Sequence, residues 1–156
     1  MFFRRTALTI AALFVSGGLC AFDVQYGSFF AVHDVSVEDG RPVLPLARGK
    51  YANVRMLDEE TFFFVKNCSG NCRQPAVSAD ARIVEMRAAQ TRADMWIADV
   101  SFGGQWLITF LIFKNPTGYR VIEPEHFSFL NDSLQQRVRQ MLFARAAQEA
   151  APKEQK

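Results

Sequence analysis

The side chains in this sequence that could act as nucleophiles, bases or metal ligands include its three cysteines and two histidines. Cys68 and Cys72 stand close together, with three residues between them, whereas Cys20 lies at the end of an apolar leader. Redox-active pairs usually have two intervening residues and sit at a helix N-terminus, which lowers the pKa of the attacking thiol. The residues before Cys68 indicate a strand, so we predict a structural disulfide between Cys68 and Cys72 that holds one turn in shape.

The two histidines offer little for a metal site or a hydrolytic triad. His126 follows Glu123 with the spacing Glu-x-x-His, which binds metal when a helix places both side chains on one face. Pro124 interrupts that spacing, so we predict a polar loop there and neither a metal nor another cofactor. No motif ties Ser69 to His126 or to His33, and a Gly-x-Ser-x-Gly elbow is absent from the sequence. The sequence therefore favours a non-enzymatic protein.

Asp99 is the one acidic residue within a long apolar segment, residues 95–113. An acid among apolar neighbours can have a shifted pKa that suits it to catalysis. It can also lie at the rim of a sheet, where its carboxylate reaches water. We favour the rim for Asp99.

The chain contains 15 phenylalanines, more than a small core requires. Most should be buried, but a minority could form an exposed apolar patch, and such patches mark partner surfaces. A run of three phenylalanines in a strand must place one on the face opposite its neighbours. We therefore predict a partner surface made of that run and of the loop between the two cysteines: Phe62, Phe63, Phe64, Ser69, Gly70 and Asn71.

Residues 1–21 have the layout of a secretory signal peptide. A basic pair is followed by an apolar run and then by small residues before the predicted cleavage after Ala21 or Cys20. The alternatives are retention as a membrane anchor, for which the apolar run is short, and acylation at Cys20, for which the preceding Leu19 is large. We predict a periplasmic or secreted protein that contacts a membrane only through this segment, if it is retained.

The charge balance argues against nucleic acid as a partner. The whole chain has 18 basic and 16 acidic side chains. Removal of the leader takes away Arg4 and Arg5 but no acid, which leaves a net charge of about zero. Binding to phosphates needs a basic surface, so we expect the partner to be another envelope or extracellular protein.

The element that should organise the fold is a hairpin over residues 95–113. Gly103 and Gly104 separate two apolar runs, and a two-residue turn of glycines suits a hairpin because its favoured forms need positive φ. Such a turn would pair Phe102 with Gln105 and put Asp99 on the face that carries the even-numbered residues of the second strand. That face would consist of Trp106, Ile108, Phe110 and Ile112.

The second strand of this hairpin is apolar on both faces, as expected of a strand that is covered on both sides. A C-terminal helix over residues 133–147 can cover only one of them. It would begin at Asp132 and dock through a stripe at helical spacing, which consists of Leu134, Val138, Met141 and Leu142. We predict that earlier strands of the same chain cover the other face.

The predicted fold is mostly β: a single antiparallel domain, barrel- or sandwich-like, with about seven strands and one C-terminal α-helix. The domain should span residues 22–147 and be followed by a disordered tail, residues 148–156. Residues 61–67 are expected to be a strand. Residues 82–90 fit either a strand or a helix, because Ile83, Val84 and Met86 do not settle the period, and we favour a strand.

One short segment resembles a known family. Asp58-Glu59-Glu60-Thr61-Phe62, followed by the two cysteines, is similar to the strand and cysteine loop of the periplasmic inhibitors of vertebrate lysozyme. In that family a small disulfide loop inserts into the lysozyme active site, although the family loop is longer than this one and contains a histidine.

Two functions follow from these observations. The first is an exported, non-enzymatic binding or envelope-assembly protein that acts through contacts with another protein. The alternative, implied by the resemblance, is a periplasmic inhibitor or immunity-type protein that uses the Cys68–Cys72 loop against a hydrolase.

Overall fold

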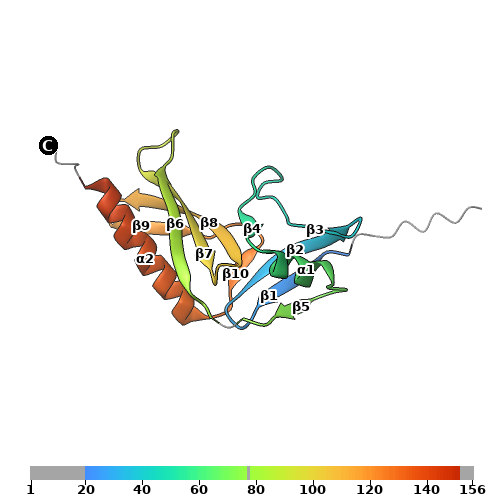
Figure 1. Cartoon of the computed structure of the whole chain (residues 1–156). Helices are drawn as coiled ribbons and strands as arrows, with labels where there is room; N and C mark the ends of the chain where they lie inside the picture. The colour runs from blue at the N-terminus through green and yellow to red at the C-terminus, as the bar shows by residue number, and fades with distance from the viewer. Residues whose placement is uncertain (1–19, 77, 152–156) are drawn as a thin grey trace, which may run out of the picture.

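The computed structural model describes residues 20–76 and 78–151, so the predicted signal peptide lies almost entirely outside the described residues. These residues form two sheets and two helices. Figure 1 shows helix α2 along the second sheet on one side of the molecule and helix α1 beside the first sheet on the other. The mostly β fold with a C-terminal helix is confirmed, and the sheets do not close into a barrel. None of the described helices is long and apolar enough to cross a membrane.

The first sheet has five strands in the order β10-β2-β1-β5, with β3 paired to the far end of β2. Its pairs are antiparallel except β1 with β5, which run parallel. The strand bounds are β1 Phe22–Tyr26, β2 Phe30–Glu38, β3 Arg41–Val43, β5 Cys72–Gln74 and β10 Phe127–Phe129.

The second sheet is antiparallel throughout, in the order β4-β8-β7-β6, and β9 also pairs with β8. It contains the predicted central hairpin, β7 and β8, and the strand predicted over residues 82–90, which is β6. The bounds are β4 Val54–Met56, β6 Ala81–Ala88, β7 Met95–Phe102, β8 Trp106–Asn115 and β9 Gly118–Ile122.

The register of the central hairpin differs by one residue from the prediction. Phe102 pairs with Trp106 and not with Gln105, because the turn contains three residues and not two. Gly103 and Gly104 both have positive φ, +58° and +72°, a conformation that costs glycine little. The glycine signal for a turn was therefore correct, and the assumed turn length was wrong.

A shift of one residue exchanges the two faces of a strand. The even-numbered residues of β8 therefore share a face with the even-numbered residues of β7, and Asp99 lies opposite Thr109 on the other face. Apart from Lys114 at the end of β8, the members of the even face are buried: Trp96, Ala98, Val100, Phe102, Trp106, Ile108, Phe110 and Ile112.

The chain itself covers this buried face, as predicted. The Phe30 ring from β2 lies 5.1 Å from the Phe102 ring, centroid to centroid, and meets the Trp106 ring edge-on. Phe127 from β10 approaches Phe110 at 5.7 Å. Edge-to-face and tilted aromatic pairs at these distances add to the stabilisation from burial.

Helix α2 spans Asp132–Ala150 and so continues beyond the predicted end at residue 147. Its N-cap is Asn131 and not the predicted Asp132, since the Asn131 Oδ1 accepts the Leu134 N–H at 2.9 Å. The apolar stripe is as predicted, with Met141 half-buried at its edge. The buried side chains of the helix are Leu134, Val138, Leu142 and Ala146.

A second helix, α1, spans Glu59–Lys66, and the prediction of a strand over residues 61–67 is wrong. Asp58 caps this helix, with its Oδ1 accepting the Thr61 N–H at 2.9 Å. Thr61 and Val65, one turn apart, are buried beneath it. The aromatic run favours a strand by propensity, but the cap and the burial of one helical face outweigh that preference.

Candidate functional site

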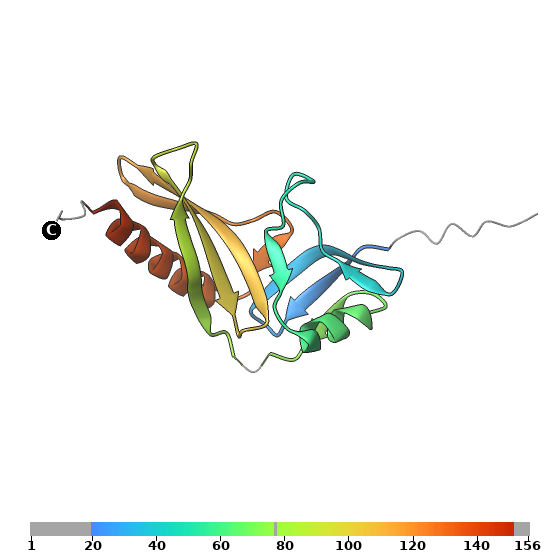
Figure 2. The ribbon, with the colours of Figure 1, turned by 45° about the horizontal axis from the view of Figure 1, so that its top comes forward.

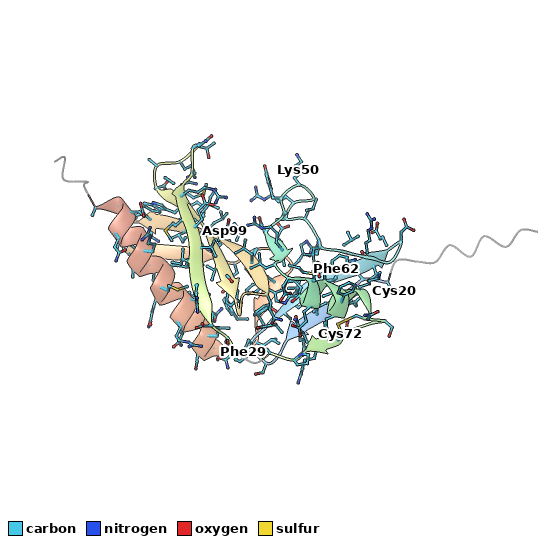
Figure 3. The ribbon with its side chains drawn as sticks, in the orientation of Figure 1. Cys20, Phe29, Lys50, Phe62, Cys72 and Asp99 are labelled. Atoms are coloured by element: carbon cyan, nitrogen blue, oxygen red, sulfur yellow. A yellow bond between two sulfur atoms is a disulfide. The ribbon has the colours of Figure 1, made fainter. Side chains whose placement is uncertain are left out.

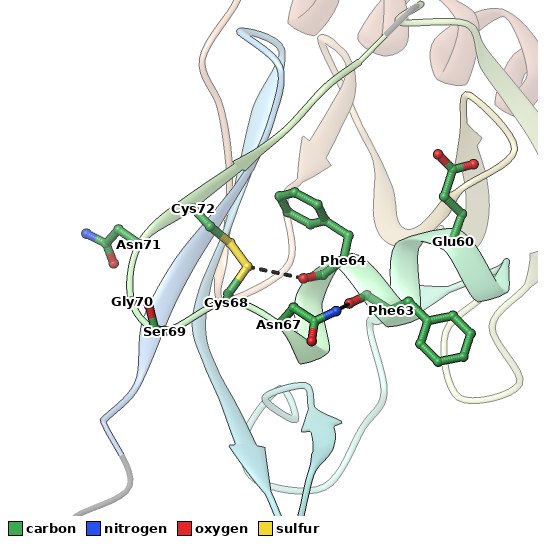
Figure 4. Close-up of a pocket in the computed structure, with 9 residues that line it drawn as sticks. All are labelled: Glu60, Phe63, Phe64, Asn67, Cys68, Ser69, Gly70, Asn71 and Cys72. Atoms are coloured by element: carbon green, nitrogen blue, oxygen red, sulfur yellow. Dashed lines mark hydrogen bonds between the residues drawn. A yellow bond between two sulfur atoms is a disulfide. The ribbon is translucent and has the colours of Figure 1, made fainter.

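The C-terminal half of α1 and the disulfide loop together form a shallow hollow of about 600 Å³ (Figure 4). The hollow brings most of the predicted partner residues together, although they lie on a helix and a loop and not on a strand. We call it the loop hollow. Its lining consists of Glu60, Phe63, Phe64, Asn67, Cys68, Ser69, Gly70, Asn71 and Cys72.

The predicted bond between Cys68 and Cys72 is present. Cys68 follows the last turn of α1, where its N–H donates to the Val65 carbonyl at 3.1 Å, and Cys72 begins β5. The bond therefore ties the end of the helix to the edge of the first sheet. A helix C-terminus lacks the positive end of the dipole that would stabilise a thiolate, which fits a structural role.

Replacing both cysteines, Cys68→Ser with Cys72→Ser, should lower the free energy of unfolding by about 2 kcal/mol or less. So short a loop restricts the unfolded chain only slightly, and β5 keeps its pairing with β1. Urea unfolding of the exported protein and the double variant measures the difference. Reduction of the wild type with dithiothreitol should cause the same loss. Complete unfolding of the variant, or free thiols in natively exported protein, would contradict a minor structural role.

The tip of the loop is free to meet another molecule. Asn71 is held at its side chain, because its Oδ1 accepts the Asp23 N–H at 2.9 Å. Ser69 is exposed, and a methyl group added at Gly70 would meet no atom within 4 Å. Beside them the Phe63 side chain is 53% exposed.

The opposite side of α1 forms a second hollow of about 570 Å³, which we call the strand hollow. Phe62 faces this hollow and not the loop hollow, because successive helical residues point about 100° apart. The helix therefore divides the three predicted phenylalanines between two sites. The strand hollow is lined by Pro42, Leu44, Ala52, Val54, Arg55, Met56, Leu57, Asp58, Glu59 and Phe62.

Five exposed large apolar side chains belong to α1, to β3 and to the loops on either side of β4. These are neighbouring segments of the ribbon in Figure 2. Sequence reasoning assigned only Phe63 among these side chains to a partner surface. Tyr51 is 61% exposed, more than Phe63. We call this set the α1 surface, and it consists of Val43, Leu46, Tyr51, Leu57 and Phe63.

Buried hydrogen bonds fix α1 to the core. The Gln74 amide donates to the Thr61 hydroxyl at 3.0 Å and accepts from the Trp106 indole at 2.9 Å. Gln74 and Trp106 come from β5 and β8, so the helix is linked to both sheets. A satisfied buried network of this kind holds a surface element in one position.

Asp99 is distant from Phe62 and Cys72 (Figure 3) and is only 5% exposed, so its predicted place at a wet rim is wrong. The Thr109 hydroxyl donates to the Asp99 carboxylate at 2.6 Å, and Arg55 and Arg87 approach it at 3.0 and 3.5 Å. Burial raises the pKa of Asp99, but the hydrogen bonds from Thr109 and Arg55 and the two arginine charges more than offset burial. The pKa therefore lies below its ordinary value. An acid held ionised in this way is part of a structural ion-pair network and is poorly suited to proton transfer.

Asp99→Asn should destabilise the protein at neutral pH and have little effect in acid. The folded state lowers the pKa of Asp99 below its ordinary 3.8, so its contribution is present above about pH 4 and is lost as the pH falls through the folded-state pKa. The variant removes the charged partner of Arg55 and leaves Arg87 with Glu85 alone. This should cost about 1–3 kcal/mol at pH 7. Urea unfolding between pH 7 and about pH 2 measures this. A gap between wild type and variant that does not change with pH would contradict the charge-based account.

His33 lies on β2 and His126 directly precedes β10, and each contacts an aspartate. Within residues 20–76 and 78–151, no group of three or more His, Cys, Asp or Glu side chains is arranged to hold a metal ion.

Comparisons with protein-family models, with curated proteins and with solved structures find no significant match for this chain. The segment that resembles the lysozyme inhibitors is helical from Glu59, whereas the family has a strand there. The structure therefore has a disulfide loop as the resemblance implies, but the segment before the loop is a helix and not a strand.

Proposed function

We propose that this is an exported protein that acts by binding another envelope or extracellular protein through the α1 surface. The observation that carries the proposal is that most of the exposed large apolar side chains belong to α1, to β3 and to the loops on either side of β4. Among the described residues eight large hydrophobic side chains are exposed, and five of them belong to the α1 surface. The predicted signal peptide and the disulfide support export.

The energetics favour a partner at this surface. Each large apolar side chain that a partner covers contributes roughly 1.5–3 kcal/mol of burial. Aromatic side chains dominate such contacts, and Tyr51 and Phe63 are the two exposed aromatic members of the set. The buried network beneath α1 holds the helix that carries Phe63 in one position, so this part of the surface loses little entropy on binding.

Affinity capture from the native envelope fraction tests the proposal. Wild-type protein and the Phe63→Asp and Tyr51→Asp variants are used as baits, with Val84→Asp as the matched control. Val84 is 63% exposed but lies on β6, outside the α1 surface. We expect one partner to be captured by wild type and Val84→Asp and to be lost with both α1-surface variants. Equal capture by all four baits, or no specific capture by wild type, would contradict the proposal.

The exposed disulfide loop supports a second candidate, an inhibitor that inserts Ser69 and Gly70 into the active site of a hydrolase. Here the binding residues lie in the loop hollow and the strand hollow is not needed. Purified protein would slow the hydrolysis of peptidoglycan by lysozyme, and Ser69→Arg would abolish that effect while Tyr51→Asp would not. No inhibition by wild type at micromolar concentration would exclude lysozyme as the target.

A further inference from the structure

We propose that Ser128 is a nucleophile, activated by His33 and Asp23, that accepts acyl groups from carboxylic esters. These three side chains come from β10, β2 and β1, which are neighbours in the first sheet (Figure 1). The site is separate from the α1 surface and independent of the binding function proposed above. It would give a chemical activity to a chain whose sequence favours a non-enzymatic protein.

The geometry is that of a nucleophile, a base and an orienting acid. The Ser128 Oγ lies 2.8 Å from the His33 Nε2, and the His33 Nδ1 lies 3.1 Å from the Asp23 Oδ1. An ionised carboxylate can only accept a hydrogen bond, so the proton of the neutral imidazole is on Nδ1. The Nε2 atom is then the acceptor, and the Ser128 hydroxyl donates to it. A nucleophile aimed at a free lone pair of an oriented histidine is the arrangement that serine hydrolases use.

A local irregularity of the backbone produces this arrangement. In the pairing of β1 with β2, a single residue, Asp23, lies opposite two residues, His33 and Asp34. Asp34 has φ of +58°, which is uncommon for a residue with a side chain. Such bulges change the direction of side chains and are frequent beside active sites. Here the bulge leaves His33 between Asp23 and Ser128.

A second aspartate–histidine pair holds the bulge in place. The Asp34 carboxylate lies 2.7 Å from the His126 Nδ1, and the His33 N–H donates to the His126 carbonyl at 2.8 Å. His126 also has a left-handed backbone, with φ of +60°. Asp34 and His126 contact each other, and residues held in this energetically unfavourable backbone conformation cluster at functional sites. They position β10, and with it Ser128, against β2.

The relay is partly exposed to solvent, and Ser128 itself is half-buried. The side chains of His33 and Asp23 are 35% and 41% exposed, so reagents in solution can reach them. On the adjacent strands Gln25 pairs with Arg73, and the Arg73 Nε donates to the Gln25 Oε1 at 3.0 Å. Gln25 therefore keeps its amide nitrogen as a donor, and Arg73 adds a positive charge. Gln25 and Ser128 both pair with Ala31 of β2, from the two neighbouring strands. Residues paired across strands share a face of the sheet, so Gln25 and Ser128 lie on the same face, and a donor there suits an ester whose acyl oxygen becomes negative during attack.

The reaction is an acyl transfer that needs no cofactor. The Ser128 Oγ forms a bond to the ester carbonyl carbon while its proton moves to the His33 Nε2. The bond from that carbon to the alcohol oxygen then breaks, and the alkoxide takes the proton from His33. Water attacks the acyl-Ser128 ester with His33 again as the base, which releases the carboxylic acid and restores the Ser128 hydroxyl.

A fluorophosphonate probe tests the nucleophile directly. The Ser128 Oγ would displace fluoride from phosphorus, and intact mass with peptide mapping would find one label, on Ser128. Ser128→Ala should remove the label, and His33→Gln or the near-isosteric Asp23→Asn should slow labelling by about 10²–10⁴-fold. Ser36→Ala is the matched control, because Ser36 lies on β2, the strand that carries His33, and donates to Glu38 at 3.4 Å. It should label like wild type.

Hydrolysis of p-nitrophenyl acetate provides a second readout, and Ser128→Ala should no longer release p-nitrophenol.

Phe63→Asp should react with the fluorophosphonate probe at the wild-type rate, which separates this site from the partner surface. The proposal is overturned if wild type labels no faster than Ser128→Ala. It is also overturned if His33→Gln and Asp23→Asn label at the wild-type rate while circular dichroism shows them folded, since the three side chains would then form a purely structural cross-strand contact.

Discussion

Phe110→Asp is expected to unfold the isolated protein. Phe110 is completely buried on the even face of β8, where its ring packs against Phe102, Phe127 and Phe129 at centroid distances of 6.5, 5.7 and 6.1 Å. Loss of a buried phenylalanine costs about 3–5 kcal/mol, and a carboxylate without a partner in the same place costs several more. The sum is comparable with the whole stability of a small domain, about 5–15 kcal/mol.

Circular dichroism and size-exclusion chromatography of the purified variant measure this result. Phe63→Asp is the matched control, because it makes the same chemical change at a side chain that is 53% exposed. That variant should remain folded and monodisperse. A soluble, folded Phe110→Asp monomer would show that the even face of β8 is not sealed within the chain and that it serves instead as a binding surface.

Leu142→Ala should lower the free energy of unfolding by about 2–5 kcal/mol. Leu142 is fully buried in the stripe through which α2 docks on the core. Its truncation removes apolar contacts and leaves a cavity that a packed helix cannot close by moving. Urea unfolding, monitored by tryptophan fluorescence, measures the loss, because Trp106 and Trp96 are both buried in the core cluster that includes Leu142.

Two variants on the exposed side of α2 serve as controls. Arg137→Ala removes an exposed side chain and should change stability by less than about 0.5 kcal/mol. Arg139→Ala also breaks an exposed ion pair with Glu123, 2.9 Å long, and should cost at most about 1 kcal/mol. Losses at these positions equal to that of Leu142→Ala would mean that the docking face of α2 is misassigned.

Structural features that depend on residues close together in the sequence were predicted correctly. The apolar residues of α2 recur every three or four positions, and the apolar runs on either side of Gly103 and Gly104 predict two strands and a turn. Both signals arise from local geometry, since burial of one face of an element imposes its own period on the chain. The disulfide between Cys68 and Cys72 belongs to the same class, because a separation of four positions limits the cysteines to one turn.

The register of the hairpin could not be predicted from local sequence patterns. Two-residue and three-residue turns both accept Gly103 and Gly104, and the choice depends on what the two faces then meet. A turn that includes Gln105 puts Phe110 in the core and Asp99 beside Thr109 and Arg55. The alternative would have set Asp99 on the face of Phe110. Only the packing of the first sheet and α2 against one face decides between them.

Helix α1 shows the same limit within a short segment. Its phenylalanines favour a strand, and its Asp58 cap favours a helix. Burial of Thr61 and Val65 beneath the helix, with the bond from Gln74 to Thr61, decides for the helix. Residues predicted as one partner surface are consequently divided between two hollows.

By itself, the sequence determined that the chain is mostly β, that it ends in an amphipathic helix and that its two later cysteines pair. The tertiary structure alone decided which distant side chains meet. Asp23, His33 and Ser128 share no motif, and only the order of β1, β2 and β10 and the bulge at Asp34 bring them within hydrogen-bond distance. Strand order depends on contacts between residues far apart in the chain, and such contacts leave no period in the sequence.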